Sequence, residues 1–299
     1  MLGTLPSTHR MAVRGLGLLR LWLAIVMILL SVAVVASPVW AAGTISLTNL
    51  NVAVSEDFDT LASSGTSSTV PNGWEFLESG TSASVNGLYT AGTGSSNTGD
   101  TYSFGATGSS DRALGALRSG TINTIIGAHF TNDTGSTITQ LTISYTGELW
   151  RLGTTGRDDR IDFQYSLTAT GLNTGAFVDV NELDVVTPDS SGTAGARDGN
   201  DPQYRTTVSH TITGLTIDPG ASFWIRWVDF DASGADDGLA IDDFSLIPGG
   251  ASSSTNPTGS ATVTPASVDA GDTTLTTVDV TPGTNPASTN LSVVANLAA

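Results

Sequence analysis

The densest group of residues that could bind a metal ion is an acidic stretch between positions 229 and 243. Its first half has the pattern D-x-D-x-S-G and ends at Gly234. Carboxylates at alternate positions, followed by a glycine that permits a sharp turn, form the first half of an EF-hand calcium loop. The twelfth position of such a loop should be glutamate and is Ala240 here, which excludes an EF-hand. Two interpretations stay open: a calcium loop of another kind, or aspartates that only cap turns and are solvated.

Catalytic groups are scarce. The chain has no cysteine and no lysine, which excludes disulfides, thiolate metal sites, cysteine nucleophiles, Schiff-base chemistry and a P-loop. The G-x-S-x-G motif of one class of serine hydrolases is absent from the sequence. Glycoside hydrolysis needs two carboxyl groups on either side of one bond, but Glu75 and Glu78 lie three residues apart, on opposite faces of a strand. His129 and His210 each stand alone in a strand-like run. We therefore expect no catalytic residue in this chain.

Charge excludes one class of partner. Twenty-eight acids face 11 basic residues, all of them arginine, in 299 residues, for a formal charge of −17. Nucleic acids are bound through basic surfaces that contact phosphates. We therefore expect no nucleic-acid partner through this segment.

The elements that must position these residues are strands. Apolar and polar residues alternate at Leu141–Tyr145, Ile161–Tyr165 and Phe223–Val228, with clusters of Gly, Asn, Asp and Ser between such runs. Alternation with period two is typical of half-buried strands. About ten such runs predict an all-β fold, a two-sheet jelly-roll sandwich.

Four regions follow from composition. Arg10, Arg14 and Arg20 precede a 16-residue apolar run and small residues up to Ala41, which predicts a secretory signal peptide over residues 1–41, cleaved near Ala41. Residues 44–248 should form the sandwich and 249–258 a linker. Residues 259–299 hold three strand-like runs, too few for a complete immunoglobulin-like sandwich. We interpret them as a truncated Ig-like β module, from a fragment or from a sheet completed by another chain.

Three stretches resemble a known family. They are SEDFDTLASSGTSSTVPNGWEFLESG (55–80), ISYTGELWRLG with RIDFQYSL (143–167), and RDGND with ITGLTIDPGASFWIRWVDFDASGADDGLAIDDFSL (197–246). They resemble the concanavalin A-like jelly-roll module of large secreted bacterial proteins, which often precedes lamin-tail or endonuclease/exonuclease/phosphatase domains. The tail from residue 259 resembles the Ig-like spacer of the same proteins. The resemblance implies an accessory module, with any catalysis in another domain.

The resemblance also implies where a structural Ca²⁺ would lie. Such modules often hold calcium between their first and last strands, which offer acids near positions 56–59 and 242–243. Together with the turn, the candidate metal ligands are Asp57, Asp59, Asp229, Asp231, Asp236, Asp242 and Asp243. We expect these carboxylates to crowd at one end of the sandwich, where a cation would relieve their repulsion.

The functional hypotheses differ in class. The first is a secreted, extracellular, non-catalytic accessory module for adhesion, spacing or ligand binding, without a stable membrane anchor after signal cleavage. Its partner would be an extracellular polysaccharide or cell-surface component. The second is the front end of an extracellular nuclease or phosphoesterase. The third is a lectin-like carbohydrate-binding module, in which Trp150, Arg151 and the loop 157–160 would edge a groove.

Overall fold

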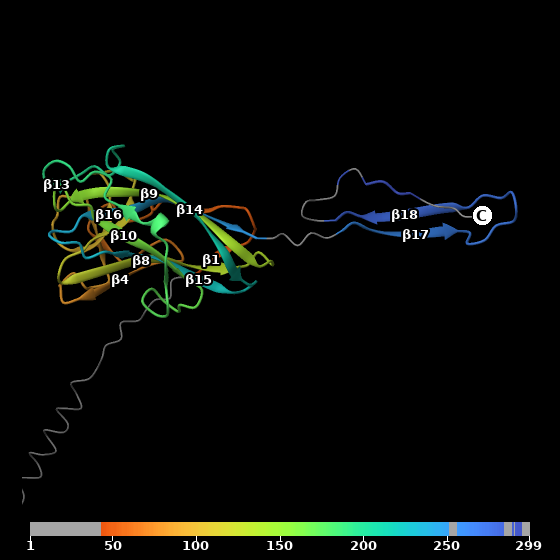
Figure 1. Ribbon diagram of the computed structural model, residues 1–299, viewed down its shortest axis with the longest axis horizontal. Coiled ribbons are helices and arrows are strands. Elements are labelled where there is room, and N and C mark those ends of the chain that lie inside the picture. The colour runs from red at the N-terminus through yellow and green to blue at the C-terminus, as the bar shows by residue number, and fades with distance from the viewer. Residues whose placement is uncertain (1–42, 251–255, 284–288, 290, 295–299) are drawn as a thin grey trace, which may run out of the picture. The chain divides into compact units, whose positions relative to one another are not determined.

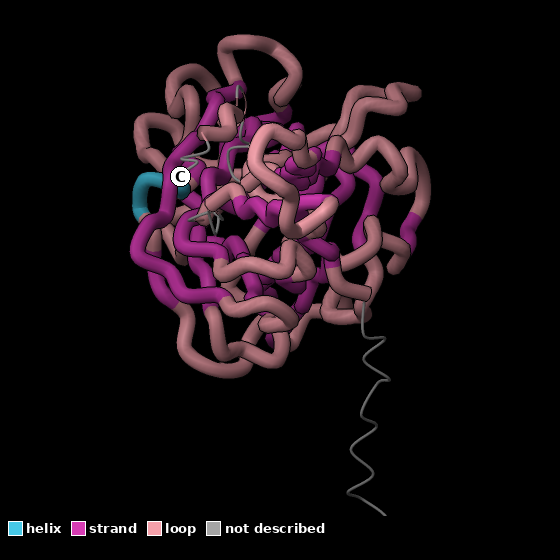
Figure 2. Tube along the Cα trace, turned by 90° about the vertical axis from the view of Figure 1, so that its right-hand side faces the viewer, coloured by secondary structure: helices cyan, strands magenta, loops and turns pink. Residues whose placement is uncertain are grey.

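The computed structural model describes residues 43–250, 256–283, 289 and 291–294 (Figure 1). The predicted signal peptide with its cleavage near Ala41, and residues 251–255 of the predicted linker, lie outside the described residues. Within the described ranges, no helix is long and apolar enough to cross a membrane. Strands dominate these ranges, and a short 3-10 helix, η1 (Asn181–Leu183), is the helical segment (Figure 2).

The first sheet, sheet A, is centred on two long strands, β8 (Ile122–Asn132) and β15 (Ser222–Asp229), which pair antiparallel. Its strand order is β1-β8-β15-β10-β11, with β4 also on β8 and β12 also on β10. Its other strands are β1 (Ile45–Leu47), β4 (Trp74–Gly80), β10 (Arg160–Ser166), β11 (Val178–Asp179) and β12 (Val185–Val186).

The second sheet, sheet B, is centred on β9 (Ile138–Leu152) and β16 (Gly238–Gly249). Its order is β13-β9-β16-β7-β6-β5-β3, with β14 also on β9 and β2 also on β16. Its other strands are β2 (Val54–Glu56), β3 (Thr66–Ser67), β5 (Tyr89–Gly92), β6 (Asp100–Phe104), β7 (Ala113–Leu117), β13 (Gly195–Ala196) and β14 (Arg205–Ile217). The expectation of an all-β sandwich is confirmed.

The core between the sheets is aromatic. The Trp74 and Trp227 rings stack at 6.0 Å, and Phe244 of β16 meets the Trp74 ring edge-on at 5.1 Å. The Trp227 indole N–H donates to the Tyr145 hydroxyl at 3.0 Å, so its polar group is satisfied inside the core. The alternation of β15 places Phe223, Ile225 and Trp227 in this core, as the sequence predicts.

The turn between β15 and β16 and the pairing of β2 with β16 determine the positions of the acidic residues. β15 belongs to sheet A and β16 to sheet B, so the turn 230–237 crosses from one sheet to the other. β2 pairs antiparallel with β16, with Glu56 opposite Phe244. The early acids 56–59 therefore lie beside β16 rather than beside the turn.

Beyond the sandwich, β17 (Thr258–Thr264) and β18 (Leu275–Thr281) form an antiparallel hairpin. Nearly all their residues are exposed. A third strand predicted near 291–295 is not formed over the described residues 291–294. The division into sandwich, linker and truncated Ig-like module stays a prediction.

Candidate functional site

The predicted metal ligands fall into two groups. Asp229, Asp231 and Asp236 lie where the chain crosses between the sheets, and we call their surroundings the crossing group. Asp57, Asp59, Asp242 and Asp243 lie around the β2–β16 pair, which we call the strand junction. The electrostatic neighbours that raise the pKa of Asp229 are Asp159 and Asp236, whereas those of Asp242 are Glu148, Asp243 and Asp111. The expected crowding of all seven at one end was wrong, because Asp242 and Asp243 lie several residues along β16 from the turn, next to the stretch of β16 that pairs with β2.

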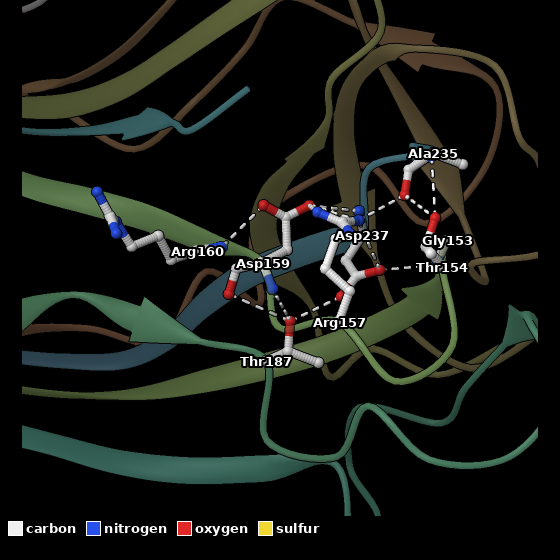
Figure 3. A network of polar contacts seen from close by, with 8 residues as sticks. All are labelled: Gly153, Thr154, Arg157, Asp159, Arg160, Thr187, Ala235 and Asp237. Atoms are coloured by element: carbon white, nitrogen blue, oxygen red, sulfur yellow. Dashed lines mark hydrogen bonds and ion pairs between the residues drawn. The ribbon is translucent and has the colours of Figure 1, made fainter. Parts of the chain in front are cut away.

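The crossing group is organised by Asp237, which the sequence analysis did not single out (Figure 3). Its Oδ1 accepts from the Gly153 amide and its Oδ2 from the Thr187 hydroxyl, both at 2.6 Å. Its own amide donates to Asp159 Oδ2 at 2.8 Å. The Arg157 guanidinium lies 3.3 Å from Asp159 and 3.8 Å from Asp237. These contacts tie three segments, 153–160, 187 and 235–237, into one network.

The other acids of the crossing group differ in their partners. Asp231 is exposed and forms an ion pair with Arg118 at 3.2 Å. Asp229 Oδ2 and Asp236 Oδ1 are buried without a hydrogen-bond partner. Burial raises the pKa of Asp236 to about 6, with the Asp159 charge adding to the effect. Burial likewise raises the pKa of Asp229 well above its usual range.

The strand junction holds unbalanced negative charge. Glu148 of β9 is fully buried, and its Oε2 accepts from the Trp150 indole at 2.9 Å. Arg205 of β14 lies 3.5 Å from both Glu148 and Asp243. Burial raises the pKa of Asp242 to about 8 and that of Glu148 to about 7. One arginine thus faces several carboxyl groups, which disfavour ionisation of one another.

The remaining predicted ligands at the junction make local contacts. Asp59 Oδ1 accepts from the Arg112 amide at 3.1 Å, and Asp57 Oδ1 accepts from the Asp59 amide at 3.2 Å. Over the described ranges, no three His, Asp or Glu side chains are placed so that they could hold a metal ion. Calcium at any of the seven aspartates therefore requires the side chains to reorient toward a common point, and it stays a prediction.

Glu148 and Asp242 are the groups whose pKa values would suit acid–base catalysis near neutral pH. Both are inaccessible: Glu148 is 0% exposed and Asp242 4%. A carboxyl group must contact the bond that it cleaves. In the described arrangement, neither carboxyl group of this pair can reach a substrate.

The tryptophan predicted to edge a groove is buried. Trp150 is 2% exposed and ends a stack of rings on the outer face of sheet B, with Phe104 at 5.9 Å and Tyr102 4.8 Å beyond Phe104. Loops close over this stack, because a Cβ on Gly199 would lie 2.4 Å from the Trp150 indole nitrogen. The hypothesis that Trp150 contacts a ligand is therefore wrong for this arrangement.

A hollow lies elsewhere, between the first half of β14 and the segment 182–188. This hollow, the β14 groove, has a volume of about 560 Å³. Its lining is polar and includes Glu182, Asp184, Gln203, Arg205, Thr207 and Ser209. Sequence reasoning missed it because its two walls come from two separate segments, 182–188 and 202–209, that have no shared motif.

Comparison with known proteins gives similarity of fold only. No family model and no curated protein matches the chain. The structure is similar to the K3 cleaved adhesin domain of Lys-gingipain from Porphyromonas gingivalis, with 12% identity, a TM-score of 0.39, and coverage of 65% of this chain and 98% of that one. It is also similar to a family 11 carbohydrate-binding module from Clostridium thermocellum, in complex with a β-1,3-1,4-mixed-linked tetrasaccharide, with 13% identity, a TM-score of 0.29, and coverage of 66% and 96%. These neighbours are β-sandwich modules, and similarity at this level carries no argument about function.

Proposed function

We propose that this chain is a secreted, non-catalytic β-sandwich module that binds an extracellular polysaccharide or cell-surface component. The predicted signal peptide and the resemblance to the concanavalin A-like modules of exported bacterial proteins support the location and the accessory role. The observation that carries the proposal is the β14 groove, an open hollow lined by hydrogen-bonding side chains.

The chemistry of the groove suits hydroxyl-rich ligands. Thr207 and Ser209 offer hydroxyls, Gln203 offers an amide that also donates to Asp189, and Arg205 offers N–H donors beyond those that face Glu148 and Asp243. Sugar hydroxyls both donate and accept, so a mixed lining of donors and acceptors can pair with them directly or through water. A volume of about 560 Å³ lies within the range of small-ligand sites, which is roughly 300–1,000 Å³.

Binding without turnover agrees with the placement of the carboxyl groups. Glu148 and Asp242, whose pKa values burial raises to about 7 and about 8, are buried. The groove carboxylates Glu182 and Asp184 lie on one wall, beside η1. The groove lining therefore contains neither Glu148 nor Asp242, and of its own carboxyl groups Asp184 has a pKa that burial raises to about 6.

The test is affinity gel electrophoresis of the purified chain against a panel of soluble polysaccharides, including β-1,3-1,4-glucan, β-1,4-galactan, xylan and dextran. We expect retarded migration with at least one polymer and no release of reducing ends. A double substitution in the groove, Gln203→Ala with Thr207→Ala, should weaken that binding by about tenfold or more.

A matched control uses the same residue types outside the groove. Gln140 and Thr213 are exposed cross-strand partners on β9 and β14. The double substitution Gln140→Ala with Thr213→Ala should change the affinity less than twofold. Equal losses in both double variants, or no retardation by any polymer, would contradict the proposal.

A further inference from the structure

An exposed aromatic ring lies close to the β14 groove. Among the described residues, Phe230 is the aromatic side chain that is exposed, at 43%, directly after β15. The tryptophans of the sandwich are each 4% exposed or less. A flat apolar ring that stays in contact with water suits ligands with one apolar face and a polar rim.

Phe230 is held in place on several sides. The Arg160 guanidinium lies over its ring, 4.3 Å from the centroid, and the Phe230 amide donates to the Arg160 carbonyl at 3.1 Å. Arg160 in turn forms an ion pair with Asp162. The following residue, Asp231, is tied to Arg118. A ring positioned in this way loses little further freedom when a ligand stacks on it.

The ring is continuous with the groove through one residue. Arg160 and Val186 are directly opposite each other on β10 and β12. Opposite residues in an antiparallel pair have their Cβ atoms about 4.5–5.5 Å apart on the same face. Val186 is 46% exposed and lines the β14 groove. Phe230, Arg160, Val186 and the β14 groove therefore follow one another along the surface. We call this continuous surface the track.

Charge restricts what could occupy this track. The groove carries Glu182 and Asp184, Asp162 lies beside Arg160, and the whole chain has a formal charge of −17. Arg205, the arginine in the groove, is already within 3.5 Å of two carboxylates. An anionic polymer would approach a surface of its own sign, which like-charge repulsion disfavours.

We propose that Phe230 and Arg160 form a sugar-stacking subsite that extends the β14 groove, and that the ligand is an uncharged polysaccharide. The C–H face of a pyranose ring packs on the face of the phenyl ring that Arg160 leaves open, and the guanidinium donates to hydroxyls of a neighbouring sugar in the polymer. This inference rests on the proposed function and deepens it by naming the ligand class and a second contact site.

The test uses isothermal titration calorimetry of the full chain with the polymer that binds most strongly in the panel above. Phe230→Leu keeps an apolar side chain but removes the flat ring, and we expect the affinity to fall about tenfold or more. Phe230→Trp restores a flat ring and should keep the affinity within about threefold of the wild type. Thermal melting of each variant checks that the fold is intact.

The sandwich offers a matched control. Phe177 is also covered by an arginine, with the Arg226 guanidinium 3.7 Å from its ring centroid, but it precedes β11, which pairs with the far end of β10. Phe177→Leu should leave the affinity unchanged. If Phe230→Leu also changes it less than twofold while the groove double variant loses binding, the subsite is wrong and the proposed function stands.

Ligand charge is tested with matched polymers: hydroxyethyl- against carboxymethylcellulose, and dextran against carboxymethyl-dextran. Binding confined to uncharged members of the pairs and the panel supports the inference. Equal or stronger binding of a carboxymethylated member overturns the ligand class. Failure of the wild-type chain to bind any polymer overturns both this inference and the proposed function.

Discussion

Asp229 ends β15 with its side chain toward the interior, where it lines a small cavity with Thr124 and Trp227. Its Oδ2 has no hydrogen-bond partner, and Thr124 Oγ1 lacks one as well. A buried carboxyl group of this kind disfavours its charged form, so its pKa lies well above the usual range. Folding is therefore opposed wherever the pH would ionise this group.

The substitution Asp229→Asn removes this ionisation with little change in shape. We expect the free energy of unfolding of the variant to fall less steeply than that of the wild type as the pH is raised from 5 to 8. One proton linked to folding corresponds to a slope of about 1.4 kcal/mol per pH unit. Urea denaturation at several pH values measures the slope.

Asp158→Asn is the matched control, because Asp158 is an exposed aspartate in the neighbouring loop. Its pH dependence should follow that of the wild type. Identical slopes for Asp229→Asn and the wild type would show that Asp229 is not protonated on folding.

At the scale of elements, the polar network around Asp237 holds the loop after β9 against the turn that leads into β16 (Figure 3). Asp237→Ala removes the acceptor of two 2.6 Å hydrogen bonds and leaves the Gly153 amide and the Thr187 hydroxyl without it. We expect a loss of about 2–4 kcal/mol in the free energy of unfolding. Hydrogen exchange at Gly153 should accelerate at the same time.

Asp236 provides the contrast one residue away. Its Oδ1 is buried without a partner, and burial raises its pKa to about 6. Asp236→Ala should therefore leave stability unchanged or increase it at pH 8. A comparable loss in both variants would mean that the network around Asp237 is not what stabilises the loops.

The strand junction is where the calcium prediction is best tested. In the crossing group Asp237 and Asp231 already have partners, whereas Asp242 has mainly other carboxyl groups around it. If calcium binds, free ion at about 100 times its dissociation constant adds about 2.7 kcal/mol, roughly 5–10 °C in melting temperature. We expect this shift between EDTA and millimolar CaCl₂, and we expect it to survive Asp231→Asn but not Asp242→Asn. Equal melting temperatures in the two buffers would contradict a calcium site.

The sequence predicts the long strands well, because alternation over five or more residues marks β9, β10 and β15 and their buried faces. Strands of two or three residues, such as β3, β11 and β12, carry no periodicity to detect. The sequence identified the candidate metal ligands by residue type, but it did not predict that they divide between the crossing group and the strand junction. Nothing in the sequence between Asp229 and Asp242 shows that the chain changes sheets there. Glu148 comes near Asp242 only through the pairing of β9 with β16, and Asp159 joins the turn only through a hydrogen bond from the Asp237 amide.

At the scale of the whole molecule, buried acids set the pH dependence of stability. Burial raises the pKa of Asp100 and Asp184 to about 6, of Glu148 to about 7 and of Asp242 to about 8. Each group then binds protons more tightly in the folded chain than in the unfolded one. Stability therefore rises as the pH falls from about 8 toward 5, and it is lost as the pH rises through these pKa values.

We expect the melting temperature in EDTA to be higher at pH 5.5 than at pH 8, by about 5 °C or more. The falling net negative charge acts in the same direction. Calcium bound at the strand junction would oppose this trend, because a cation keeps the carboxylates ionised. A melting temperature in EDTA that falls on acidification from pH 8 to 5.5 would show that these acids are not protonated on folding.

The enclosure of the tryptophans has an optical consequence. Trp74, Trp150, Trp224 and Trp227 are all buried, so the folded sandwich should emit at short wavelength and shift to the red as water reaches the indoles. The Trp224 ring is stacked on the His129 imidazole at 4.3 Å, and burial lowers the pKa of that imidazole. The imidazole is thus protonated at a lower pH than an exposed histidine, and its protonation quenches one indole while the other three still report an intact core.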